Sequence, residues 1–212
     1  MRPRAARRIV GFMIHCYQSA REWEPYATRF GIAFQPGAQL EVRPGQSGIF
    51  VRRPRADHPG SLNALASFEA VTGRWGLIPL FSKDGEDPLF EAPAESAANE
   101  RNYHQPWKRG HRCVVLADAL IEQGKGAARQ QLARADGKVL AIAGLWNGWR
   151  SPEGQCVESF AVFTVGAEDG QRHVALLHDA WIEDWLACPV EETAAYLRPY
   201  VPASDLVRRE VA

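Results

Sequence analysis

Four short segments in the second half of the chain limit the folds that it can adopt. Each is a run of mainly apolar residues or alternates apolar with polar residues, which is typical of strands. They are Arg112–Glu122, Gln130–Ala135, Val139–Trp146 and Phe160–Val165, and Asp136-Gly137 predicts a hairpin turn between the second and the third. Strands that outnumber helices, without a strand-helix-strand rhythm, predict an α+β fold: a β-rich single domain of antiparallel sheets with a few short peripheral helices.

The remaining segments contribute few regular elements. Trp23–Gly31 has apolar residues at helical spacing and closes on a glycine, and Trp181–Leu186 and Val190–Leu197 are typical of short helices. Prolines and glycines interrupt Pro36–Pro59, so only short strands and loops fit there. Ser67–Pro79 predicts a pair of strands. A chain of 212 residues favours one domain.

The charge of the chain gives only a weak indication of function. Lysine plus arginine number 25 and aspartate plus glutamate also number 25, so the overall charge does not indicate a nucleic-acid-binding protein. The first eight residues carry four arginines and no acid, and Arg52, Arg53 and Arg55 form a second basic cluster. Such clusters are usually solvated surface and sometimes contacts to phosphate.

The cysteines and the apolar runs indicate the compartment. Cys16, Cys113, Cys156 and Cys188 lie far apart without a C-x-x-C pair, which argues against a zinc ribbon and against a disulfide-linked secreted module. No apolar stretch approaches the roughly 18–20 residues of a membrane span, and Ile9–Ile14 is too short for a signal peptide. We expect a cytoplasmic or nucleoid-associated protein with reduced thiols, and neither a metal nor a cofactor.

Five segments resemble, in order and approximate spacing, motifs of the SRAP family (SOS-response-associated peptidase). Arg74–Pro79 resembles W-G-L-I-P, Arg112–Glu122 resembles R-C-L-x-P-x-x-G-F-Y-E, and the others are Cys16–Ala20, Ala143–Trp146 and Phe163–Ala167. Each motif alone is weak, but five in the correct order indicate a divergent member. The resemblance divides the chain into a basic N-terminal extension, residues 1–15, and an SRAP-like domain, residues 16–212.

The resemblance implies a barrel-like, β-rich domain with a basic cleft for single-stranded DNA. Members of the family capture abasic sites, where the lost base leaves a sugar that can open to an aldehyde. An N-terminal cysteine, exposed by removal of the initiator methionine, attacks that aldehyde, and its thiol and α-amine close a thiazolidine ring. An asparagine, a glutamate and a histidine assist.

Cys16 is the positional match for this nucleophile, but fifteen residues precede it. An internal cysteine has no α-amine, so it could form only a reversible hemithioacetal unless the chain is cut between His15 and Cys16. The alternative is a buried small apolar residue. Glu122 matches the family's glutamate, and its apolar neighbours predict partial burial and a raised pKa suited to acid–base work. The alternative for Glu122 is a solvated carboxylate at a strand end.

The assisting asparagine and histidine are replaced. An ungapped alignment places Glu91 at the asparagine and Pro93 at a DNA-contacting arginine, whereas a gapped one uses Asn99-Glu100-Arg101. The histidine position falls at Gly170, and His173 is the candidate substitute.

A basic face for DNA is the second implication of the resemblance. Trp75, Trp107 and Trp149 could stack on bases, which is worth roughly 1–3 kcal/mol per base, although tryptophans at strand ends usually pack in the core. The predicted DNA-binding residues are Arg74, Trp75, Glu91, Lys108, Arg109, Arg112, Arg150 and Arg172.

Three functions remain open at this point. The first is a monomeric abasic-site sensor on single-stranded DNA, with Cys16 as nucleophile and Glu122 as acid or base. The second is a degenerate relative that keeps the fold and binds DNA or a partner without catalysis. The third is a peptidase that pairs Cys16 with His173. The first requires Cys16 and Glu122 to lie together.

Overall fold

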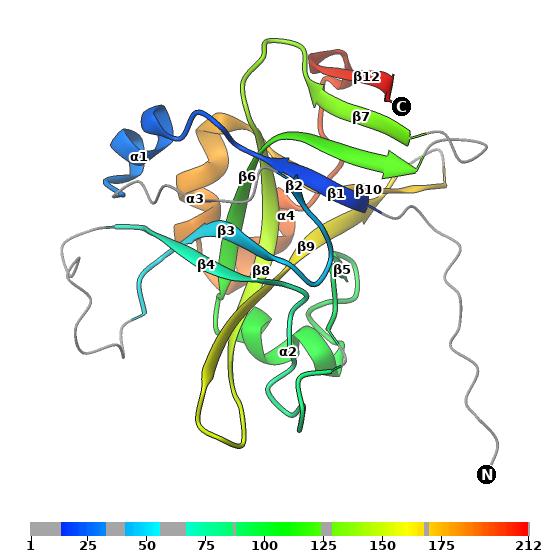
Figure 1. Cartoon of the computed structure of the whole chain (residues 1–212). Helices are drawn as coiled ribbons and strands as arrows, with labels where there is room; N and C mark the ends of the chain where they lie inside the picture. Colours follow the sequence, from blue (N-terminus) through cyan, green and yellow to red (C-terminus); the bar gives the residue numbers. More distant parts are fainter. Residues whose placement is uncertain are drawn as a thin grey trace.

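The computed structural model describes residues 14–32, 41–55, 67–86, 88–123, 129–167 and 170–211 (Figure 1). Five strands close into a barrel in the order β8-β9-β4-β3-β6, with β6 returning to pair with β8. These strands are β3 (Ser47–Arg52), β4 (Glu69–Trp75), β6 (Arg112–Gln123), β8 (Leu140–Arg150) and β9 (Cys156–Gly166). The β4–β9 pair is parallel and the other four pairs of the barrel are antiparallel. The predicted β-rich, barrel-like α+β fold is confirmed, although the sheet is mixed rather than wholly antiparallel.

The long apolar run in β6 reflects burial on both faces. Successive residues of a strand point to opposite sides, and Val114 and Leu116 join one core cluster whereas Val115 and Ala117 join the other. The buried members of the second cluster all come from strands, and the first also includes side chains of the helices. A strand buried on both faces needs apolar residues at consecutive positions.

Seven further strands extend this barrel in the described part of the chain. β1 (Ile14–Ser19) pairs with β6 and with β2 (Glu41–Val42), and β7 (Arg129–Arg134) pairs with β6 and β12 (Leu206–Val211). β5 (Glu91–Pro93) and β10 (Arg172–Val174) lie along β9, and β11 (Leu176–Leu177) lies along β8. Figure 1 shows β1 alongside β6, with which it pairs in the antiparallel direction.

The predicted hairpin between the second and third apolar segments is wrong. Asp136 and Gly137 do form a turn, with Gly137 at φ 75°, but β7 and β8 do not pair with each other. Both pair with β6, β8 along its first half and β7 along its second half. A twelve-residue strand is long enough to accept the two neighbours in succession.

The helices lie around the barrel. The predicted helix α1 (Glu24–Phe30) is confirmed and ends at Gly31, whose φ of 64° suits a glycine. α3 (Ile182–Ala187) and α4 (Thr193–Tyr196) follow the predicted short helices, and 3₁₀ turns occupy 179–181, 190–192 and 203–205. α2 (Arg101–Lys108) was not predicted from the sequence. None of the helices in the described residues has the length and apolar character to cross a membrane.

Candidate functional site

The register between β1 and β6 separates Cys16 from Glu122. Ile14 lies opposite Glu122, and Cys16 lies opposite Ile121, with a bulge at the intervening residue of β1. Directly opposed residues share a face of a sheet, and consecutive residues point to opposite faces. Ile14 therefore shares the face of Glu122, and Cys16 lies on the other face.

Core packing supports the same division of faces. Ile14, Tyr17 and Leu120 belong to one core cluster, and Leu120 is two positions from Glu122 and so shares its face. Cys16 contributes to neither core cluster, although only 1% of it is exposed. The requirement that Cys16 and Glu122 lie together is not met.

Two carboxylates converge on Ile14. The backbone N–H of Ile14 donates to the carboxylate of Glu91. The Cα of Ile14 lies opposite the Cα of Glu122 in the β1–β6 ladder. Glu91 is fixed by β5, which pairs with β9, and by α2, because the Tyr103 hydroxyl donates to the Glu91 carbonyl at 2.7 Å. The unpredicted helix α2 thus positions one of the predicted site residues.

Glu122 is only 3% exposed. Burial raises the pKa of its carboxyl group, whereas the nearby charges of Arg208 and His173 act in the opposite direction. Nε of Arg208, on β12, lies 3.7 Å from Oε2 of Glu122. The predicted burial and the raised pKa are confirmed, and the raised pKa favours the protonated form of the carboxyl group.

This raised pKa predicts a pH-dependent contribution to stability. Because the folded state holds the Glu122 proton more tightly than the unfolded state, its stabilisation is present below the unfolded pKa and is lost as pH rises through the folded pKa. We therefore expect the free energy of unfolding of the wild type to fall, relative to that of Glu122→Gln, between pH 5 and pH 7.5. Urea unfolding at both pH values measures this difference.

The matched control for this experiment is Glu95→Gln. Burial pushes the pKa of Glu95 upward, but hydrogen bonds from the Gly166 N–H and from Arg172 lower it overall. The stability that Glu95 contributes is present above its unfolded pKa and is lost only as pH falls below that value, so Glu95→Gln should show little change relative to the wild type between pH 5 and pH 7.5. If the free energy of unfolding depends on pH equally in the wild type and in Glu122→Gln, the raised pKa of the buried Glu122 carboxyl group is contradicted.

Arg172 links β10 to the same region. Its Nε donates to the Thr164 hydroxyl at 3.1 Å, and its Nη2 donates to the Thr164 carbonyl at 2.7 Å and to Glu95 at 2.8 Å. Burial raises the pKa of Glu91, and the Ile14 N–H and the charge of Arg172 oppose that rise. The structure thus brings the predicted residues Glu91, Glu122, His173 and Arg172 together around Ile14. We name these five residues, with Arg208, the Ile14 cluster.

The environment of Cys16 disfavours a reactive thiolate. Nη2 of Arg129 lies 3.7 Å from Sγ and favours the ionised form. Burial and the negative charge of Glu41 outweigh it, so the pKa of the thiol is raised. A nucleophilic cysteine normally has a lowered pKa, because the thiolate is the reacting form. The other three cysteines are free as well.

Several predicted DNA contacts have a structural role in this fold. Trp75 is 1% exposed, and its Nε1 donates to the Phe90 carbonyl. Arg112 is 5% exposed, and its three nitrogens donate to the carbonyls of Trp185 and Cys188 and to the Thr193 hydroxyl. Neither side chain can reach a phosphate or a base from these positions. Both side chains therefore have structural roles in the core in place of the predicted DNA contacts.

The other two tryptophans that were predicted to stack on bases are packed against the protein itself. Trp149 is buried and donates to the Ser82 carbonyl at 2.8 Å, and Trp107 packs edge-on against Phe163. Arg74 is half-buried, with Nη1 3.3 Å from the Gly85 carbonyl. The exposed members of the predicted basic face are Lys108, Arg109 and Arg150.

Lys108 and Arg109 precede β6, whereas Glu122 lies near its other end. Ten residue steps of a strand span about 33 Å, so these cations and the Ile14 cluster lie at opposite ends of β6. The predicted site and the predicted basic face are therefore largely separate.

Two residues of the Ile14 cluster escaped the sequence analysis. Ile14 was missed because β1 was not predicted as a strand, so no register with β6 could be assigned. Arg208 was missed because β12 was not predicted, although Leu206–Val211 is a short run of residues compatible with a strand. Within the described residues, no group of three or more His, Cys, Asp or Glu side chains is arranged to hold a metal ion.

Most of the chain is similar to known proteins. The family described as "SOS response associated peptidase (SRAP)" matches residues 15–212. A solved structure of a protein from Bordetella bronchiseptica is 29% identical in sequence and superposes with a TM-score of 0.80. The superposition covers 93% of this chain and 99% of that one.

Two relatives have names that describe an activity. Abasic site processing protein HMCES of Gallus gallus is 25% identical over 164 residues, covering 59% of this chain and 48% of that protein. Abasic site processing protein YoqW of Bacillus subtilis is 26% identical over 138 residues, covering 60% of this chain and 59% of that protein. The chain spans about half the length of these curated relatives.

Proposed function

Because the chain belongs to the SOS response associated peptidase (SRAP) family, we propose that it acts in the response to DNA damage and binds abasic sites in single-stranded DNA without a covalent bond. The names of the relatives from Gallus gallus and Bacillus subtilis support this substrate class. The observation that carries the proposal is Ile14, which lies between Glu91 and Glu122 where a reacting group would have to stand. An isoleucine side chain offers no nucleophile.

The polar groups around Ile14 suit recognition of an opened sugar. In its protonated form, which burial favours, the Glu122 carboxyl group can donate a hydrogen bond to a sugar oxygen, and Glu91 can accept one from a sugar hydroxyl. Arg208, whose side chain is 46% exposed, provides a positive charge beside them for a neighbouring phosphate. The thiol of Cys16 is buried on the opposite face of the sheet and holds its proton, so it takes no part.

The same geometry argues against the peptidase hypothesis. A Cys/His peptidase needs the imidazole within hydrogen-bond reach of the thiol. The charge of His173 acts on Glu122, on the face away from Cys16. We therefore propose binding and not peptide hydrolysis.

The proposal predicts a complex that denaturation dissociates. Fluorescence anisotropy should show several-fold tighter binding of a single-stranded oligonucleotide with one abasic site than of the intact oligonucleotide. After heating in detergent, the intact mass of the protein should be unchanged, and Cys16→Ala should behave like the wild type. Arg208→Gln should weaken binding by about tenfold, whereas Arg21→Gln, an exposed arginine paired with Asp118 elsewhere, should not.

Two results would overturn the proposal. A heat-stable adduct that Cys16→Ala abolishes would restore the thiol mechanism. Equal affinity for the intact and the abasic strands would exclude abasic sites as the specific ligand.

A further inference from the structure

A second polar region lies at the other end of β6 from Glu122. It is a hollow of about 680 Å³ whose lining includes Arg53, Arg55, Arg109, His111, Arg112 and Trp146, and we name it the basic hollow. These residues come from the segment after β3, from the segment between α2 and β6, from the start of β6, and from β8. The basic hollow shares no residue with the cluster around Ile14.

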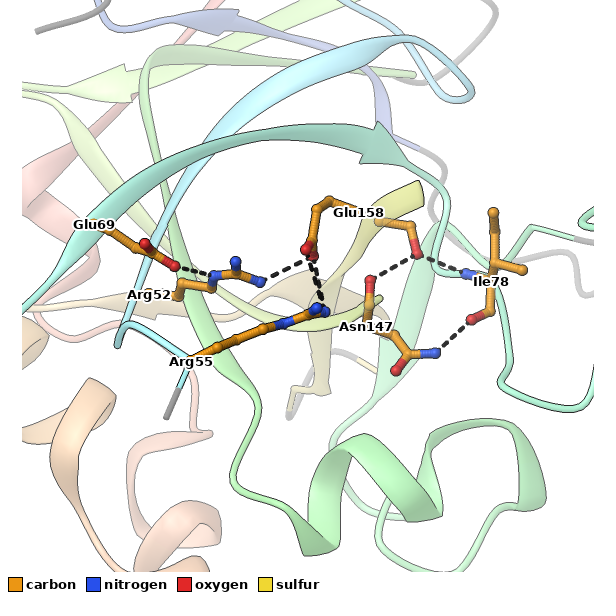
Figure 2. Close-up of polar contacts among 7 residues, drawn as sticks. Arg52, Arg55, Glu69, Ile78, Asn147 and Glu158 are labelled. Carbon is orange, nitrogen blue, oxygen red and sulfur yellow. Dashed lines mark hydrogen bonds and ion pairs between the residues drawn. The ribbon is translucent and has the colours of Figure 1, made fainter. Parts of the chain in front are cut away.

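The acids near the basic hollow neutralise only part of its charge. Figure 2 shows Arg52 between Glu69 and Glu158, and Arg55 beside Glu158 at 3.2 Å. These two arginines and two glutamates balance one another. In the described part of the chain, no carboxylate lies within ion-pair distance of the remaining arginines of the lining, which are Arg53, Arg109 and Arg112.

Arg112 contributes a buried positive charge with neutral partners only. Its acceptors are two carbonyls and a hydroxyl, which satisfy its N–H groups but do not cancel its charge. Burial, with the nearby charge of Arg53 as a smaller cause, lowers its pKa, yet an arginine remains protonated at neutral pH. A buried uncompensated charge is costly, and an anion in the hollow would relieve that cost.

The aromatic group in the hollow is already covered. His111 stacks on Trp146 with ring centroids 4.0 Å apart, and the guanidinium carbon of Arg52 also lies 4.0 Å from the ring centroid. Trp146 itself is only 4% exposed, so both faces of its indole are covered. Because neither face is available for a base, a ligand here is recognised through its charge and not through stacking.

The position of Arg55 depends on the glycine at 148. A Cβ at Gly148 would collide with the guanidinium of Arg55, so only a residue without a side chain lets Arg55 lie across β8 beside Glu158. Arg55 therefore lines the hollow in a position that its ion pair with Glu158 fixes, and Figure 2 shows this pair.

We propose that the basic hollow binds a phosphate monoester or a free phosphate, at a site independent of the Ile14 cluster. The exposed guanidinium groups of Arg53 and Arg109, together with the buried charge of Arg112, match a doubly charged phosphate better than the single charge of a phosphodiester. Arginine is suited to this role because its planar N–H groups bind phosphate oxygens in pairs. Two sources carry this group: the 5′-phosphate at a DNA end, and a small phosphorylated molecule.

The test uses the full chain and isothermal titration calorimetry with inorganic phosphate and pyrophosphate, each titrated in 150 mM chloride. The double variant Arg53→Gln, Arg109→Gln removes two exposed cations of the hollow without disturbing the core. The matched control Lys108→Gln, Arg150→Gln removes two exposed cations that do not line it. We expect the Kd of pyrophosphate to rise at least tenfold in the first double variant and less than twofold in the control.

A second arm distinguishes the two sources. Undamaged single-stranded oligonucleotides with a 5′-phosphate or a 5′-hydroxyl are compared by fluorescence anisotropy. A gain in affinity from the 5′-phosphate that the hollow variant loses would support the site and assign it to a DNA end. Binding of pyrophosphate without such a gain would support the site and assign it to a small molecule.

The proposal would be overturned if the wild type binds neither phosphate nor pyrophosphate, or if the two double variants weaken binding equally. Because both oligonucleotides are undamaged, this outcome is independent of abasic-site binding through the Ile14 cluster.

Discussion

A chain that begins at Met13 and carries Ile14→Cys and Glu91→Asn is expected to form a heat-stable adduct with abasic single-stranded DNA. Removal of the initiator methionine would leave the new cysteine with both a thiol and an α-amine. Position 14 lies opposite Glu122, so this thiol would share the face of the group that can transfer a proton. The thiol and the amine together could then close the thiazolidine ring that the family resemblance implies.

The second substitution follows from the charge of Glu91. The Ile14 N–H donates to the Glu91 carboxylate, so a free α-amine at residue 14 would lie beside a negative charge. A nearby carboxylate favours the protonated amine, which is not nucleophilic. Asparagine keeps a hydrogen-bond acceptor there and removes the charge.

Intact mass after incubation with abasic DNA and heating measures the adduct. We expect at least tenfold more adduct from this variant than from the full-length chain with the same two substitutions, whose thiol lacks the amine. The same short chain with Ile14→Ser should form none. A folded Met13 variant that forms no adduct would show that position 14 does not face the sugar.

The second large effect is expected from Arg112→Met. The substitution removes three hydrogen bonds from a charged donor, two of them to carbonyls and one to a hydroxyl. At roughly 1.5 kcal/mol for each hydrogen bond to a charged group, the free energy of unfolding should fall by about 4.5 kcal/mol. That is a large part of the ~5–15 kcal/mol that stabilises a typical domain.

Urea unfolding followed by tryptophan fluorescence measures this loss. Arg109→Met provides the control, because Arg109 is exposed three residues earlier and its replacement should change stability by less than about 0.5 kcal/mol. An unchanged urea midpoint in Arg112→Met would mean that the segment from α3 to α4 is held without Arg112.

The fold could be predicted where local patterns decide the structure. Gly31 marks the end of α1, and the apolar run of β6 indicates a buried strand. The partners of β6 could not be predicted, because they depend on how its twelve residues are shared among neighbours. α2 was missed because Pro106 stands inside it, and a proline normally argues against a helix interior.

The candidate site could be predicted only in part, for a related reason. Glu91, Glu122, His173 and Arg172 were found by their order in the chain, and they do lie in one region. Cys16 was assigned by the same reasoning, but a bulge in β1 and the alternation of side chains place it on the opposite face. Neither a bulge nor a strand register leaves a reliable trace in a single sequence.

The contact between Arg208 and Glu122 also has a consequence for the newly made protein. The Ile14 cluster combines the first described strand with β12, so 194 positions separate Ile14 from Arg208. At about 5–20 residues per second, a ribosome needs roughly 10–40 seconds to make that length. Glu91 and Glu122 are made during this interval, and until it ends the nascent chain carries them without the cation from β12. The cluster is therefore completed only when translation reaches the last strand.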